Sequence, residues 1–230
     1  MSNVWRILQL ADSAFPVGGF AHSAGLEAAV QLGEVADAEA FRAFVKDVLW
    51  QTGYGALPLV RAAHAAAESI DAKDAIESIA RVDAACDAFL TSAVANRASR
   101  TQGRALAATC ARVFDVHAVR ALDDAVRARR LAGHFAPLFG ALTRALAVDV
   151  EDAQRLALHL ALRGVASAAV RLGVAGSHEA QRMQDASAPE LDRVMVACAG
   201  LGIDALAQPA PLLEIFGGAQ DRLYSRLFQS

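Results

Sequence analysis

Long stretches of this chain place apolar residues three or four positions apart, the spacing that brings side chains onto one face of an α-helix. The clearest set is Phe41, Phe44, Val45, Val48 and Leu49. The chain is rich in alanine and leucine and has only 6 prolines in 230 residues, so few residues interrupt such a pattern. No run of alternating apolar and polar residues is long enough to predict a sheet. The sequence therefore predicts an all-α protein.

Helix-breaking residues divide this pattern into about ten segments. Ser23 is expected to cap a short helix that Gly33 ends. Asp37 is expected to cap a helix from 37 to 67, which the Gly-Tyr-Gly sequence at 53–55 interrupts. No internal repeat or low-complexity linker separates the segments, so we expect one compact domain over residues 1–230. The remaining predicted helices span 72–94, 99–114, 119–131, 135–146, 152–172, 177–186 (capped by Ser177) and 187–198.

The segment 8–27 departs from the helical pattern and contains residues that restrict or free the backbone. Pro16 disfavours α geometry at the residue before it, and the glycine pair at 18–19 can adopt positive φ. Phe20 and His22 follow within a few positions. Proline and glycine at these positions disfavour regular structure, yet the residues around them form no recognised catalytic motif. We interpret the segment as shaped for recognition.

The last stretch, 206–230, differs from the rest of the chain. Pro209, Pro211 and the glycine pair at 217–218 predict an irregular course. Residues 223–228 then gather two aromatic side chains, two leucines and an arginine close to the end. Chain ends are usually frayed and polar. We therefore expect this apolar end to dock, either on its own core or on a partner.

Charge and hydropathy exclude two classes of partner. The formal net charge is −3, whereas binding a phosphate backbone requires a concentrated basic face. Charged residues interrupt every apolar run well before the roughly 18 residues that span a bilayer. The amino terminus has no cationic stretch followed by an apolar region, so no secretory signal is expected. The sequence predicts a cytoplasmic protein that binds neither nucleic acid nor membrane.

The residues that usually hold metals form no recognisable site. Cys86, Cys110 and Cys198 lie far apart and form no CxxC motif, and no histidine pair has the spacing of two ligands on one helix. We expect the cysteines to be core residues in a reducing compartment, and we expect neither a bound metal nor a cofactor.

Asp12, Ser13 and His22 are the one set that suggests catalysis, as a nucleophile with a base. No G-x-S-x-G elbow accompanies them, and the glycine pair at 18–19 lacks the lysine that follows in a phosphate-binding loop. We expect these side chains to make loop hydrogen bonds instead. A helical hydrolase or transferase that uses the three residues stays open as the alternative.

Arginines recur along one predicted helix. Arg97, Arg100 and Arg104 are three and four positions apart, so their side chains share one helical face. Such a face is most often simply solvated, but planar guanidinium groups also suit recognition of an acidic partner surface. The sequence alone does not decide between these readings.

The stretch 11–27 resembles the N-terminal signature of the UreF family of urease accessory proteins. Three further stretches agree in the same order along the chain, which makes the resemblance specific: 97–104, then 168–173 followed by Gln181-Arg182, then 224–228. The sequence departs from the family pattern at Ala11, Ala21, Ala24, Ser177, Ala180 and Gln220.

The resemblance implies an all-α homodimer that is not itself an enzyme. Proteins of this family bridge the accessory protein UreD, also called UreH, and the GTPase UreG, and the assembly inserts nickel into apo-urease as GTP is hydrolysed. The resemblance also implies that Gln181 and Arg182 lie near the dimer face that receives UreG. Regulation of UreG turnover is an overlapping possibility that the sequence leaves open. The residues implied to face UreD are Phe20, His22, Tyr224, Arg226, Leu227 and Phe228.

Overall fold

The computed structural model describes residues 3–16, 22–69 and 74–229, and within them the chain is helical with no strand. The predicted all-α class is confirmed. The short 3₁₀ turns η2 (Ala67–Ser69) and η3 (Ile203–Ala205) lie between helices, and η4 (Gln220–Arg222) follows the last helix. The α-helices are α1 (Val4–Ala11), α2 (Leu26–Gln31), α3 (Ala38–Gly55), α4 (Leu57–Ala66), α5 (Ala75–Phe89), α6 (Ala93–Val113), α7 (His117–Arg127), α8 (Phe135–Ala145), α9 (Val150–Leu172), α10 (Ser177–Ala186), α11 (Ala188–Cys198) and α12 (Pro211–Ala219).

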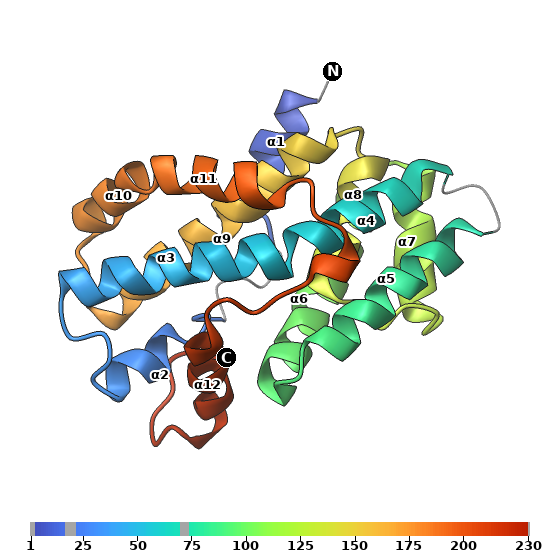
Figure 1. The fold of residues 1–230 in the computed structure, drawn as a ribbon. Helices are drawn as coiled ribbons and strands as arrows, with labels where there is room; N and C mark the ends of the chain where they lie inside the picture. The colour runs from blue at the N-terminus through green and yellow to red at the C-terminus, as the bar shows by residue number, and fades with distance from the viewer. Residues whose placement is uncertain (1–2, 17–21, 70–73, 230) are drawn as a thin grey trace.

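Helix α3 crosses the middle of the molecule, as Figure 1 shows. In this view α10 and α11 lie on one side of α3, and α2 and α12 lie on the other. Helices α4 to α8 gather at one end. The carboxyl end of the chain lies beside α12, so the last residues sit close to the short N-terminal helix α2.

Buried apolar side chains form one core cluster that extends from Leu10 to Phe228. The backbones of α8 and α4 approach closely in it, and a Cβ atom built on Gly140 would lie 2.2 Å from the carbonyl oxygen of Val60. Only glycine permits this approach, because any side chain would push the two helices apart. No helix in the described part of the chain is both long and apolar enough to cross a membrane.

The predicted break inside 37–67 is confirmed. Helix α3 ends at Gly55, and α4 begins at Leu57 with Pro58 in its first turn, where a missing N–H costs no hydrogen bond. The carboxylate of Asp37 caps α3 by accepting hydrogen bonds from the Glu39 and Ala40 amides at 2.9 and 2.8 Å. The local sequence pattern was sufficient here because both signals act within one helical turn.

Two predicted caps were wrong by a residue or two. Ser23 was expected to cap the helix before Gly33, but the N-cap of α2 is Gly25, whose φ of 85° lies in the left-handed region. Ser177 was expected to cap α10, but the N-cap is Gly176, whose amide donates to the Glu179 carboxylate at 3.4 Å. At Gly25 the left-handed backbone, which glycine adopts readily, sets the boundary. At Gly176 the backbone is extended, and the hydrogen bond to Glu179 marks the start of the helix.

The prediction of an irregular tail was also wrong in its first half, because residues 211–219 form helix α12. Pro211 begins the helix at a position where proline is well tolerated. The glycines at 217–218 lie in its last turn, and packing compensates for their low helix propensity. The ring of Phe216 contacts that of Phe44 on α3, with ring centroids 6.5 Å apart.

Candidate partner-docking site

The chain end docks on its own core, along helix α2. Phe228 is only 4% exposed, and the guanidinium of Arg171 on α9 lies over its ring, 4.2 Å from the centroid. The Gln31 side chain of α2 donates to the carbonyl oxygen of Ser225 at 3.0 Å. The tail is therefore attached at both an apolar and a polar point.

Glu27 on α2 is the polar centre of this attachment. It is 2% exposed. One carboxylate oxygen accepts the Leu227 amide at 2.6 Å, and the other accepts the Phe228 amide at 3.1 Å and the Gln220 side-chain amide at 2.5 Å. Three donors thus compensate a buried carboxylate, whose burial without partners would be strongly unfavourable.

Helix α12 packs on the same N-terminal segment. A Cβ atom built on Gly25 would lie 3.1 Å from both the Gly217 amide nitrogen and the Cβ of Phe216. Gly25 therefore meets two demands at once, a left-handed backbone and a close helix contact. The described end of the segment 8–27, at Gly25 and Glu27, therefore contacts both α12 and the tail.

The predicted arginine face connects to this unit. Arg97 on α6 forms an ion pair with Asp221 at 2.8 Å, and Arg226 contacts the same carboxylate at 3.3 Å. Arg104 instead donates to the carbonyl oxygen of Ala132 at 2.9 Å, and Arg100 is partly buried. These pairs are exposed, so they align the tail more than they stabilise it.

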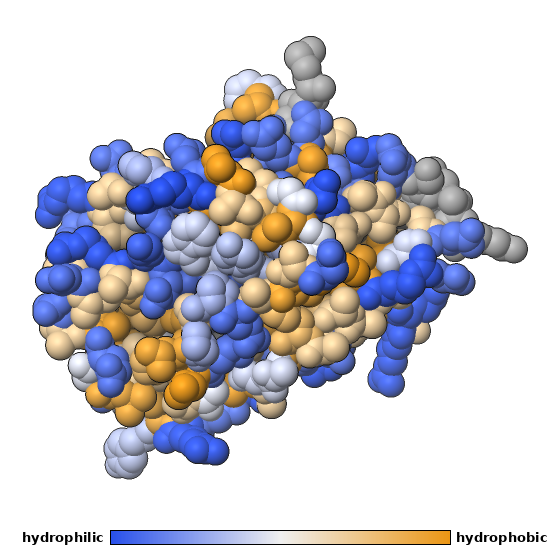
Figure 2. All heavy atoms as spheres, in the orientation of Figure 1, coloured by the Kyte–Doolittle hydropathy of each residue, from blue (hydrophilic) through white to orange (hydrophobic). Residues whose placement is uncertain are grey.

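An apolar surface remains exposed around the docked tail. Tyr224 is fully exposed, and Leu227 is 52% exposed. Figure 2 shows orange atoms gathered over α2 and α12. Leu212 and Ile215 on α12 and Leu32 directly after α2 are exposed. We call these five residues the tail surface. An apolar patch of this kind marks an interaction site more often than an isolated exposed side chain does.

The residues predicted to face UreD therefore differ in their exposure to solvent. Tyr224, Arg226 and Leu227 are exposed, whereas Phe228 is buried and anchors the tail from inside. Phe20 lies outside the described residues.

A cavity of about 540 Å³ lies among α3, α4, α6 and α9 and extends to the N-terminal segment and to α12 and the tail. His22, Arg163, Glu214 and Phe228 are among its walls, which are mostly apolar. Burial lowers the pKa of His22 and raises the pKa of Glu214, so both side chains favour their neutral forms relative to the same groups in water. His22 therefore lies inside this region and is only partly accessible.

Asp12 and Ser13 occupy the turn after α1. The Asp12 carboxylate accepts the Ala14 amide at 2.8 Å, the hydrogen bond of an Asx turn, and it lies beside the guanidinium of Arg163. Arg163 also donates to the carbonyl oxygen of Ala11 at the end of α1. Ser13 and His22 both line the cavity. The geometry of Asp12 thus fits the loop hydrogen bonding expected from the sequence.

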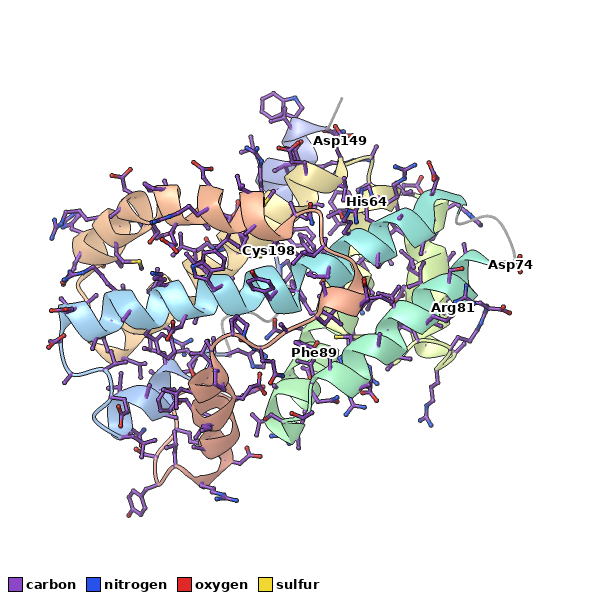
Figure 3. The ribbon with its side chains drawn as sticks, viewed as in Figure 1. His64, Asp74, Arg81, Phe89, Asp149 and Cys198 are labelled. Atoms are coloured by element: carbon purple, nitrogen blue, oxygen red, sulfur yellow. The ribbon has the colours of Figure 1, made fainter. Side chains whose placement is uncertain are left out.

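The described residues contain no cluster of three or more His, Cys, Asp or Glu side chains that could hold a metal ion. In Figure 3, Cys198, His64 and Asp74 are spread along the molecule and do not converge. Burial raises the pKa of Cys86 and of Cys110 to about 12, so both thiols stay protonated at neutral pH. A protonated, buried thiol is a poor nucleophile and a poor metal ligand.

Gln181 and Arg182 are exposed on α10, which packs on α9 and α11. Figure 1 shows α10 and the tail on opposite sides of α3. The structure therefore does not bring these two residues together with Tyr224 and Arg226.

Sequence reasoning missed three residues that hold the tail: Glu27, Gln220 and Arg171. One signal for Glu27 was present, because this acidic residue stands among Leu26, Ala28 and Ala29, all of which are buried. Gln220 was noted only as a departure from a family pattern. In the structure its amide also donates to the Phe228 carbonyl at 3.2 Å.

Comparison with known proteins connects the chain to one family. The family described as UreF matches residues 35–188. The urease accessory protein F of Arabidopsis thaliana is 37% identical over 228 residues, covering 98% of this chain and 92% of the relative. The protein of the same name from Oryza sativa subsp. japonica is 35% identical and covers 98% of this chain and 85% of the relative. UreF of Trichodesmium erythraeum is 27% identical over 231 residues, 99% of this chain and 97% of the relative.

Proposed function

This chain belongs to the UreF family of urease accessory proteins, and from that premise we propose that it is a non-enzymatic scaffold. It joins UreD and the GTPase UreG into the cytoplasmic complex that inserts nickel into apo-urease. It acts as a homodimer, and nickel is the cargo of the complex rather than a resident cofactor. Any influence on GTP hydrolysis by UreG follows from assembly of this complex.

The observation that supports this proposal is the tail surface. The last residues are tied to α2 by buried contacts, yet they leave Tyr224 and Leu227 exposed beside the apolar side chains of α2 and α12. An apolar patch that carries Tyr224 and lies beside Arg226 suits stable protein contact, since tryptophan, tyrosine and arginine are enriched among binding hot spots. We propose that UreD binds this surface.

The experiment is a titration of purified UreD with single variants of the scaffold. Tyr224→Ala and Leu227→Ala remove exposed side chains, so each should leave the melting temperature unchanged. Each should weaken UreD binding by about 2 kcal/mol, roughly thirtyfold, if it occupies a hot spot. Arg226→Ala should have an effect of similar size.

Trp5→Ala is the matched control, because Trp5 on α1 is also aromatic and is 76% exposed. This variant should bind UreD like the wild type. Wild-type affinity in both Tyr224→Ala and Leu227→Ala would refute the proposed docking surface.

We assign a different contact to α10. Gln181 and Arg182 lie away from the tail, so a double alanine variant should retain UreD and lose UreG or the homodimer. Co-purification with UreG and light scattering of the purified protein separate these two losses. Retention of both contacts would remove α10 from the proposal.

A further inference from the structure

We propose that the turn after α7 is a docking site for an acidic protein surface, and that apo-urease presents this surface in the assembly. The site consists of Arg104, Arg127, Arg129 and Arg130, which we call the basic turn. The inference rests on the proposed function only for the identity of the partner. The site itself stands on the geometry of α6, α7 and the turn.

The basic turn gathers guanidinium groups from two helices. Helix α7 ends at Arg127, and residues 127–130 are all exposed. Arg104 on α6 is exposed too, and its guanidinium reaches the same turn, where it donates to the carbonyl oxygen of Ala132 at 3.1 and 2.9 Å. The turn therefore presents four cationic side chains to solvent.

Little negative charge offsets these groups. Arg127 forms an ion pair with Asp123 at 2.6 Å, and Asp124 beside it is an exposed carboxylate. Arg129 and Arg130 form no ion pair within the described part of the chain. Two aspartates against four arginines leave a net positive charge on the turn.

The backbone at Arg129 is strained for a residue with a side chain. Its φ of 59° lies in the left-handed region, where the Cβ atom crowds the following carbonyl oxygen. The corresponding positions after α2 and α9 are glycines, Gly33 and Gly173, and the position after α8 is Ala147. Glycine would fit the turn with less strain, so the fold alone does not explain a long cationic side chain there.

The helix dipole does not explain the arginines either. A cation stabilises the carboxyl end of a helix mainly within the last turn, and Arg127 already occupies that turn of α7. Arg129 and Arg130 follow it. An exposed guanidinium fork fits a carboxylate in two-point contact, and arginine is enriched among binding hot spots. A single turn in a chain of net charge −3 is too small to follow a phosphate backbone, so the complementary surface is an acidic protein.

The position of the turn identifies the component of the assembly. The tail surface is assigned to UreD and α10 to UreG, and Figure 1 shows α7 and α10 at opposite ends of the molecule. Apo-urease is the one component without an assigned contact. A contact at the basic turn would leave the other two surfaces accessible.

The test is a titration of apo-urease with the complex of the full-length chain, UreD and UreG, at an ionic strength of about 0.05 M. Arg129→Gln and Arg130→Gln each remove one charge and should each weaken binding about fivefold, and the double variant about thirtyfold. Arg42→Gln is the control, since it removes one charge from an exposed arginine on α3. This control should bind apo-urease like the wild type.

Ionic strength supplies a second readout. Because exposed charges are screened by salt, the difference between the wild type and the double variant should shrink to less than about twofold at an ionic strength of about 0.5 M. A difference that persists undiminished would show that charge is not the basis of the contact, and it would overturn the inference.

Arg129→Gly separates docking from folding. It removes the charge and the backbone strain together, so it should weaken apo-urease binding as Arg129→Gln does while raising the melting temperature by about 2 °C or more. A lower melting temperature than that of the wild type would show that the arginine serves the fold, which would overturn the inference.

The remaining outcomes distinguish the site from its partner. Wild-type affinity of the double variant for apo-urease would refute the docking site. Loss of UreD or UreG in place of apo-urease would refute the assignment of the partner. Failure of the wild type to assemble with UreD and UreG would refute the proposed function, and direct titration of the free chain with apo-urease would still decide whether the basic turn binds it.

Discussion

Gly140→Ala should push α8 away from α4, because the two helices approach closely at this glycine. The added Cβ would lie 2.2 Å from the Val60 carbonyl oxygen and 2.9 Å from its carbonyl carbon. An ordinary contact between carbon and oxygen is about 3.3 Å or longer, so α8 must move by roughly 1 Å. The obstacle is backbone, which cannot rotate away as a side chain could.

The expected free-energy change has two opposing parts. Overpacking of a well-packed core costs about 1–3 kcal/mol, and a backbone obstacle should lie at the upper end. The higher helix propensity of alanine returns about 1 kcal/mol. We expect Gly140→Ala to lower the free energy of unfolding by roughly 2 kcal/mol.

Gly164→Ala is the matched control. Gly164 lies in the interior of α9, and a Cβ built on it would have no described atom within 4 Å apart from its own neighbours in the helix. This variant should raise the free energy of unfolding by about 0.5–1 kcal/mol. Urea unfolding followed by far-ultraviolet circular dichroism measures both variants. Equal stability of the two would refute the close packing of α8 on α4.

Two further predictions concern titratable groups. Burial lowers the pKa of His64, which is 5% exposed and donates to the Val148 carbonyl at 2.9 Å. Below the unfolded-state pKa of about 6.5, the unfolded chain binds a proton at this histidine more readily than the folded chain does. The free energy of unfolding should therefore fall as the pH drops below that value, and it should be retained above it. His64→Gln should flatten this loss in urea titrations across the acidic range, and an unchanged slope would contradict the assignment. The buried thiols of Cys86 and Cys110, with pKa values of about 12, should not react with a thiol reagent at about pH 8 until the protein is denatured; rapid labelling of the native protein would contradict their burial.

The helices were largely predictable because their signals are local. An apolar spacing of three and four positions, the cap at Asp37 and the break at 53–55 each operate within a turn or two of helix. Helix α12 was missed because its local signals, proline and glycine, argue against a helix. Contact with Phe44 and Gly25 overrides them.

The sequence by itself determined the helical class, the core face of α3, and the two segments at the chain ends that carry part of the family resemblance. It could not show that these two segments meet. The Glu27 carboxylate and the Leu227 amide are 200 positions apart, and no periodic pattern links residues at such a separation. Only the tertiary structure decided that the two aromatic residues at the end of the chain differ in position, with Phe228 buried in the core and Tyr224 exposed on the surface. That division follows from a buried carboxylate on α2, which needs donors, and from a chain end that can supply them.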